Sequence, residues 1–260
     1  EVLWGQTTYS RNSVAGEWNY YIDEEASPET IDWKRWLGPA PKRPFSAERF
    51  FRWRKYWDYS NGIASDLYYH RVGPMLFAMG PAWPVRVAGG GGIYVQKDRE
   101  VPDTLAMIVE YPNFMIVVAG SMANAAPNRY LPQVIYGHSG TIVVENDRVI
   151  VTPEMFVAKA LNRPAEARTF EFKNAQREMQ RRHTDNFFEC MRTRKTPVLG
   201  PELAHQVMLS VMLGCESYRE GELRLYDAAA RKRARRAAAR PAYEGDGRNH
   251  PLGPKKEPSV

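Results

Sequence analysis

Between residues 85 and 151 the chain consists of short β-rich runs separated by tight turns, and this pattern restricts the fold more than any other feature. Strands are predicted over 85–95, 104–110, 114–121, 133–136, 141–145 and 149–151. Turns are predicted at 111–113 and 146–148, each too short for a crossover connection. Because such turns join antiparallel neighbours, this block predicts a mostly antiparallel sheet.

Helical patterns lie on both sides of this block, and a further strand is predicted over residues 2–9. A short helix is predicted over 28–37, with Ser27 as N-cap, Pro28 in the first turn and Gly38 at the end. Longer helices are predicted over 62–79, 174–193 and 201–220. Together these elements predict an α+β domain with helices packed against one sheet.

The residues most typical of catalysis are Asp66 and His70, which stand four apart in the predicted helix over 62–79. This spacing places a carboxylate and an imidazole on one face, where the imidazole could transfer a proton near neutral pH. A solvated ion pair is the alternative reading of the same spacing. Ile63, Leu67, Met75 and Met79 form a neighbouring apolar stripe that is expected to face the core, and Pro74 is expected to kink the helix.

The glycine run at 89–92 does not make a nucleotide-binding motif. A Gly-x-Gly-x-x-Gly fingerprint would require glycine where Tyr94 or Val95 stands, and no phosphate loop occurs elsewhere in the sequence. The run is therefore interpreted as a bulge or twist inside a strand.

Charge and composition restrict the possible partners. The last 35 residues hold 9 of the 36 basic and 4 of the 30 acidic side chains, so the rest of the chain is almost neutral. We predict a folded domain over 1–225 and a basic, disordered tail over 226–260. The tail has no aromatic platform, so no nucleic-acid partner is predicted. No apolar run is long enough to span a membrane, which predicts a soluble chain and leaves its compartment open.

Three parts of the sequence resemble the carboxyl-terminal domain of the Gfo/Idh/MocA oxidoreductases. The first is Trp57-Asp-Tyr-Ser-Asn-Gly-Ile-Ala-Ser-Asp-Leu-Tyr-Tyr-His70, followed by the runs at 92–94 and 100–104. The others are the segments at 183–192 and 201–205, which look like the closing helices of that family. The resemblance extends over about residues 1–226 and implies a large, open-faced, predominantly antiparallel sheet with helices on one face.

The resemblance also implies an activity and a set of site residues. Family members oxidise or reduce a sugar or polyol hydroxyl with NAD or NADP, and the sheet commonly forms the interface of a homo-oligomer. His70 matches the histidine that transfers the proton, and Asp66 matches its acidic partner. Arg11 and Asn12 match an Arg-Asn pair that contacts substrate, and Tyr59 in the matching run is taken as a further substrate-binding residue.

Two departures from the family pattern are informative. Relatives carry a catalytic lysine in a Glu-Lys-Pro motif on the nucleotide-binding side, and this motif is absent here; Ser10 also replaces a histidine of some relatives. The chain is therefore interpreted as a substrate domain without its Rossmann half, expected to bind no cofactor and to be inactive alone. The alternatives are a relative that cleaves glycosides through transient oxidation, and a non-enzymatic binding or assembly module.

Overall fold

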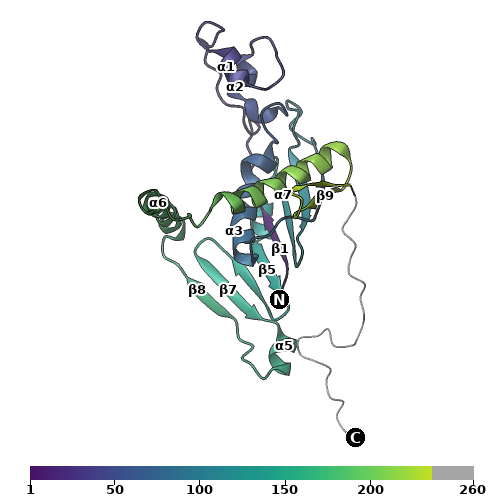
Figure 1. The fold of residues 1–260 in the computed structure, drawn as a ribbon, viewed down its shortest axis with the longest axis vertical. Coiled ribbons are helices and arrows are strands. Elements are labelled where there is room, and N and C mark those ends of the chain that lie inside the picture. The colour runs from purple at the N-terminus through teal and green to yellow at the C-terminus, as the bar shows by residue number, and fades with distance from the viewer. Residues whose placement is uncertain (236–260) are drawn as a thin grey trace.

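The computed structural model describes residues 1–235 and contains one sheet of 10 strands (Figure 1). The strands are β1 Val2–Thr8, β2 Arg86–Gly92, β3 Thr104–Glu110, β4 Met115–Ser121, β5 Gln133–Gly137, β6 Gly140–Val144, β7 Arg148–Pro153, β8 Arg168–Glu171, β9 Arg224–Asp227 and β10 Lys232–Ala234. Their order in the sheet is β10-β9-β2-β3-β4-β1-β5-β6-β7-β8. Only β1 and β4 pair in parallel. The predicted α+β class with a predominantly antiparallel sheet is confirmed.

The helices are α1 Trp33–Leu37, α2 Ala47–Phe51, α3 Tyr69–Met79, α4 Pro127–Tyr130, α5 Met155–Ala160, α6 Ala175–Thr193 and α7 Pro201–Glu220. A 3-10 turn, η1 Trp53–Lys55, and a π-helical segment, η2 Ala64–Tyr68, precede α3. Figure 1 shows α3 and α7 crossing the sheet, whereas α1 and α2 lie at one end of the molecule. The predictions over 174–193 and 201–220 agree with α6 and α7 to within one residue.

The core lies between the sheet and the helices α3 and α7. In β3, Leu105, Met107 and Val109 are buried, whereas Ile108 between them is 45% exposed. This alternation follows from the two-residue period of a strand, and it leaves the opposite face of the central sheet open. The predicted apolar stripe is confirmed as well, because its four members (Ile63, Leu67, Met75 and Met79) are all buried.

The glycine run belongs to β2, which keeps an unshifted register with β3 along its length, so the expected bulge is absent. A Cβ atom on Gly89 would lie 2.2 Å from the carbonyl oxygen of Gly214 in α7. The missing side chain therefore allows close approach of a helix backbone to the strand.

Two predicted boundaries are wrong. The predicted helix over 28–37 is α1, which begins at Trp33 with Asp32 as its N-cap, because the Ser27 carbonyl accepts hydrogen bonds from Thr30 and Ile31 and closes a turn instead. The folded domain continues beyond 225, since β9 and β10 extend it to Ala234. The remainder of the predicted tail, 236–260, lies outside the described residues.

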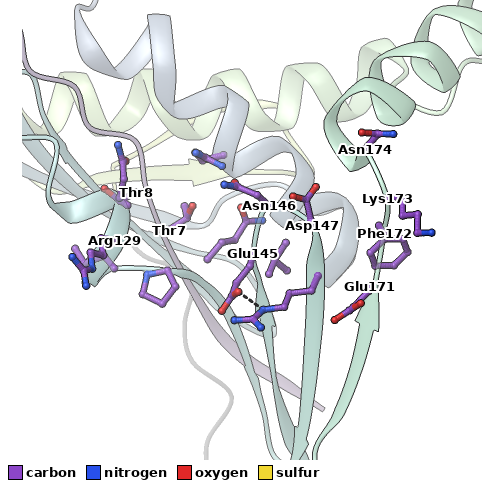
Figure 2. Close-up of a pocket in the computed structure, with 17 residues that line it drawn as sticks. Thr7, Thr8, Arg129, Glu145, Asn146, Asp147, Glu171, Phe172, Lys173 and Asn174 are labelled. Atoms are coloured by element: carbon purple, nitrogen blue, oxygen red, sulfur yellow. Dashed lines mark hydrogen bonds and ion pairs between the residues drawn. The ribbon is translucent and has the colours of Figure 1, made fainter.

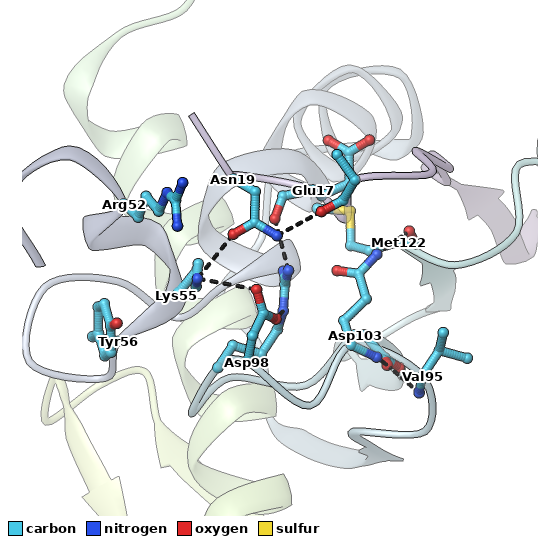
Figure 3. A network of polar contacts seen from close by, with 12 residues as sticks. Glu17, Asn19, Arg52, Lys55, Tyr56, Val95, Asp98, Asp103 and Met122 are labelled. Carbon is cyan, nitrogen blue, oxygen red and sulfur yellow. Dashed lines mark hydrogen bonds and ion pairs between the residues drawn. The ribbon is translucent and has the colours of Figure 1, made fainter. Parts of the chain in front are cut away.

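A buried polar network fixes the irregular segment between β1 and α1 to the loop before β3 (Figure 3). Lys55 is only 2% exposed, and its ammonium group contacts Asn19 Oδ1 at 2.9 Å, Glu48 at 2.7 Å and Asp98 at 3.0 Å. In the same loop, the Asp103 carboxylate accepts hydrogen bonds from three successive backbone N–H groups, those of residues 94–96. These contacts give the residues before α3 a fixed position although they have little regular structure.

Within residues 1–235, no helix is both long enough and apolar enough to cross a membrane.

Candidate functional site

His70 stands at the start of α3, where the chain passes from π-helical to α-helical hydrogen bonding. Such π-helical turns are often found at functional sites. Its ring lies 6.3 Å from the ring of Tyr9, which directly follows β1. The same Tyr9 ring carries two guanidinium groups, Arg11 at 5.4 Å and Arg71 at 5.0 Å from its centroid. The structure therefore brings an exposed imidazole together with two cations and a phenol.

The pKa of His70 is lowered from its ordinary value. Burial is the largest cause, and the positive charges of Arg11 and Arg71 act in the same direction, whereas Asp66 opposes them. The lowered pKa favours the neutral imidazole, which is the form able to accept a proton.

Asp66 is held by a cation other than His70. Its Oδ1 atom accepts a hydrogen bond of 2.7 Å from Nε of Arg54, whose guanidinium also lies 4.2 Å from the centroid of the Trp53 ring. Among residues 1–235, no hydrogen bond or ion pair joins Asp66 to His70. The two side chains interact through space, without the direct contact that the spacing of four residues suggested.

The predicted substrate residues occupy two different places. Arg11 donates to the Tyr9 hydroxyl at 3.3 Å and lies beside His70, while the adjacent Asn12 forms an isolated backbone bridge to Ala123. Tyr59 instead packs against Trp36, with 4.6 Å between ring centroids, and lines a separate hollow of about 330 Å³. The structure thus groups Arg11 with Asp66 and His70 and leaves Tyr59 in an aromatic cluster.

Ser10, the residue that departs from the family pattern, has a structural role. Its backbone N–H donates to Asn128 Oδ1 at 2.9 Å, and its carbonyl accepts from Asn128 Nδ2 at 2.6 Å. Its hydroxyl also accepts a hydrogen bond from the backbone N–H of Ser121 at 3.1 Å. These bonds tie the end of β1 to α4 and β4, and leave the 2% exposed Ser10 buried beside the site.

A cavity of about 830 Å³ opens next to this group of residues, and sequence reasoning missed it. Arg71 and Thr7 line it together with Arg129, and Figure 2 shows Thr7 and Arg129 facing Glu171 and Lys173 across the opening. Its walls come from β1, α3, α4, the β6–β7 hairpin and the segment after β8. The only sequence signal for it was the position of Arg71 directly after His70.

Comparison with known families identifies part of the chain directly. Residues 14–89 match the model of the Gfo/Idh/MocA oxidoreductase family, C-terminal alpha/beta domain. Over these residues the chain is similar to the C-terminal domain of that family. The matched residues include Asp66 and His70 and end within β2.

Solved structures show the same fold at low sequence identity. A levoglucosan dehydrogenase in complex with NADH and L-sorbose shares 15% identity with a TM-score of 0.56, and 85% of the present chain aligns with 57% of that structure. An oxidoreductase from Agrobacterium radiobacter, in complex with NAD⁺, L-tartaric acid and magnesium, shares 12% identity with a TM-score of 0.54 and coverages of 86% and 56%. An NAD-binding protein from Listeria innocua shares 13% identity, with a TM-score of 0.52 and coverages of 86% and 58%.

The chain thus spans less than two thirds of the length of these three structures. No curated protein matches its sequence.

Proposed function

We propose that this chain is the substrate domain of a Gfo/Idh/MocA-type oxidoreductase that acts on a sugar or polyol hydroxyl. In this reaction, His70 takes the hydroxyl proton as the carbon gives up its hydride, and returns a proton in the reverse direction. The observation that carries the proposal is the exposed imidazole of His70, with a lowered pKa, held beside Arg11, Arg71 and Tyr9, where Arg71 also lines a polar cavity.

The residues around His70 suit proton transfer to a bound hydroxyl. Arg11 and Arg71 disfavour the imidazolium in the resting site, which keeps the base ready, and Asp66 stabilises the imidazolium once it forms. The Arg54 hydrogen bond holds the Asp66 carboxylate in place, so this group acts as a positioning and electrostatic residue. We propose that Arg11 and Asn12 contact the substrate, and that Tyr59 serves a more distant part of it.

A nicotinamide cofactor would supply the hydride acceptor, as two of the solved structures described above are complexes with NAD⁺ or NADH. The present sequence has no Gly-x-Gly-x-x-Gly turn to hold a pyrophosphate, so its residues do not fit that group. We therefore propose that the cofactor is held outside residues 1–235. Calorimetric titration of this chain with NAD and NADP is expected to give no binding heat.

The test of the activity uses the protein expressed from its complete reading frame, with a panel of sugars and polyols and either NAD or NADP. We expect His70→Asn to lower kcat by about 10²- to 10⁴-fold, as for loss of a general base. His183→Asn is the matched control, because this histidine lies exposed on α6. Unchanged kcat in His70→Asn would remove the role given to this residue.

We further propose that the open face of the sheet forms a homo-oligomer. Ile108 and Met115 are 45% and 37% exposed, and Ala88, Ala106 and Ala119 lie on the same face in register with this region. Small and aliphatic side chains make this face flat and apolar, which suits a second copy of the same sheet. Sedimentation equilibrium is expected to show an oligomer that Ile108→Glu converts to monomer, whereas Val14→Glu at an isolated exposed position does not.

A further inference from the structure

We propose that the 830 Å³ cavity binds a polyhydroxy carboxylate, such as an aldonate or uronate, whose carboxylate is held by Arg71 and Thr7. This inference rests on the proposed function and names the substrate class of the same site, but binding by residues 1–235 can be measured without turnover and is therefore tested separately. Two unpaired atoms, the distribution of charge around the cavity and its size all favour such a ligand.

Two buried polar atoms of the cavity wall lack hydrogen-bond partners among the described residues. They are Oγ1 of Thr7 in β1 and Nε of Arg71 in α3, and both residues line the cavity. Buried polar atoms are nearly always paired, and leaving one unpaired is destabilising. A carboxylate at this end of the cavity would accept hydrogen bonds from both atoms.

The charges around the cavity are unevenly paired. Arg148 forms an ion pair with Glu145 at 2.5 Å, so this part of the wall is neutral. In the part of the chain that the structure describes, neither Arg71 nor Arg129 forms an ion pair, and both lie at the end formed by β1, α3 and α4. An arginine guanidinium matches a carboxylate through two parallel hydrogen bonds, which a neutral polyol cannot reproduce.

The other end of the cavity supplies acceptors and donors for hydroxyl groups. Asn146, Asp147, Glu171 and Lys173 line it on the β6–β7 and β8 side, and Figure 2 shows Glu171 and Lys173 opposite Arg129. A ligand with a carboxylate at one end and several hydroxyls along its chain matches this division. The volume falls in the range of about 300–1,000 Å³ typical of small-molecule sites.

The primary test is isothermal titration calorimetry of the chain with sodium D-gluconate, the neutral polyol D-glucitol and inorganic phosphate. We expect gluconate to bind at least about 10-fold more tightly than glucitol, consistent with a charge-assisted pair. Arg71→Gln should weaken gluconate binding by about 10-fold or more, and Arg71→Lys should restore part of it. Arg192→Gln, an equal change of charge on the exposed surface of α6, should have no effect.

Thr7→Val separates ligand binding from a structural role. Because the Thr7 hydroxyl is buried without a partner, the isosteric valine should leave the Tm of the free chain unchanged or higher, while gluconate binding weakens by about 5-fold. Thr152→Val, at an exposed position of β7, is the matched control. Equal affinity for gluconate and glucitol, tighter binding of phosphate, or a lower Tm in Thr7→Val with unchanged affinity would each overturn the proposal.

Discussion

Arg54 donates a hydrogen bond of 2.7 Å to Asp66, and this contact changes what the carboxylate can do for His70. A carboxylate four residues before a histidine would ordinarily raise the pKa of that histidine. Here a guanidinium binds the carboxylate, and although Asp66 still raises the pKa of His70, burial together with Arg11 and Arg71 outweighs it. The structure therefore tunes His70 toward the neutral, proton-accepting form.

Removal of this guanidinium tests the arrangement. Arg54→Gln should raise the pKa of His70, because Asp66 loses the guanidinium that binds it and acts more strongly on the imidazole. The measurement is the pH titration of the His70 ring signal by NMR in the wild-type chain and the variant. The wild-type value is expected below the ordinary pKa of a histidine.

The matched control for that experiment is Arg52→Gln. Arg52 bonds to Glu48 and to the Tyr20 carbonyl, and forms no contact with Asp66 among the described residues. Replacement of Arg52 should leave the pKa of His70 unchanged. If Arg54→Gln and Arg52→Gln shift it equally, the Arg54–Asp66 contact has no specific influence on the imidazole.

A second prediction concerns the pH profile of the proposed reaction. Because the pKa of His70 is lowered, the neutral base persists to a lower pH than for an ordinary histidine. In the oxidation direction, kcat/KM should decrease as the pH falls through this lowered pKa. Arg71→Gln should move this decrease in kcat/KM to higher pH, because it removes a positive charge that disfavours the imidazolium. If Arg71→Gln leaves the pH of this decrease in kcat/KM unchanged, the decrease reports the titration of a group other than His70.

Much of the fold follows from local sequence signals. The predicted strand over 104–110 has the same first and last residues as β3. Its alternating side chains and the turn at 111–113 define it locally. The strands β8, β9 and β10 were missed, since each is only three or four residues long, and β9 joins the sheet through β2, which lies far earlier in the chain. Sequence periodicity carries no record of such pairings.

The site could be predicted only in part, for the same reason. His70 and Asp66 share one short segment, so their spacing alone placed them near each other. The cavity takes its walls from segments more than 100 residues apart, such as Thr7 and Glu171, and no local pattern marks such an assembly. The Arg54 contact was equally hidden, because it depends on the π-helical turn and on the 3-10 turn before it.

The buried ammonium of Lys55 gives a prediction about stability. Lys55→Met should lower the free energy of unfolding by about 1–3 kcal/mol, because Asn19, Glu48 and Asp98 lose their shared donor. The carboxylates are partly exposed and can regain water, which keeps the cost below that of a fully buried pair. Lys34→Met on the exposed surface of α1 is the control, with an expected change within about 0.5 kcal/mol in urea denaturation.

The same network predicts how stability depends on acid. Burial alone would raise the pKa of Asp98, but hydrogen bonds with Asn19 and Lys55 and the charge of Arg99 lower it to about 2. Since the folded state then binds fewer protons than the unfolded state, the contribution is present above about pH 4 and is lost as the pH falls toward 2. Stability should decline across this window in the wild-type chain and decline less in Lys55→Met. Parallel curves would contradict the assignment to Asp98.

The contact between β2 and α7 gives the sharpest comparison of neighbouring residues. A methyl group on Gly89 would lie 2.2 Å from the Gly214 carbonyl oxygen, a backbone atom that cannot rotate away, whereas one on Gly90 would meet no atom within 4 Å. Gly89→Ala should therefore separate strand and helix and lower the free energy of unfolding by about 1–3 kcal/mol. Gly90→Ala should be neutral or slightly stabilising, because alanine loses less backbone entropy on folding. Denaturation midpoints of the two variants measure the difference, and equal midpoints would show that the close approach of α7 does not limit this position.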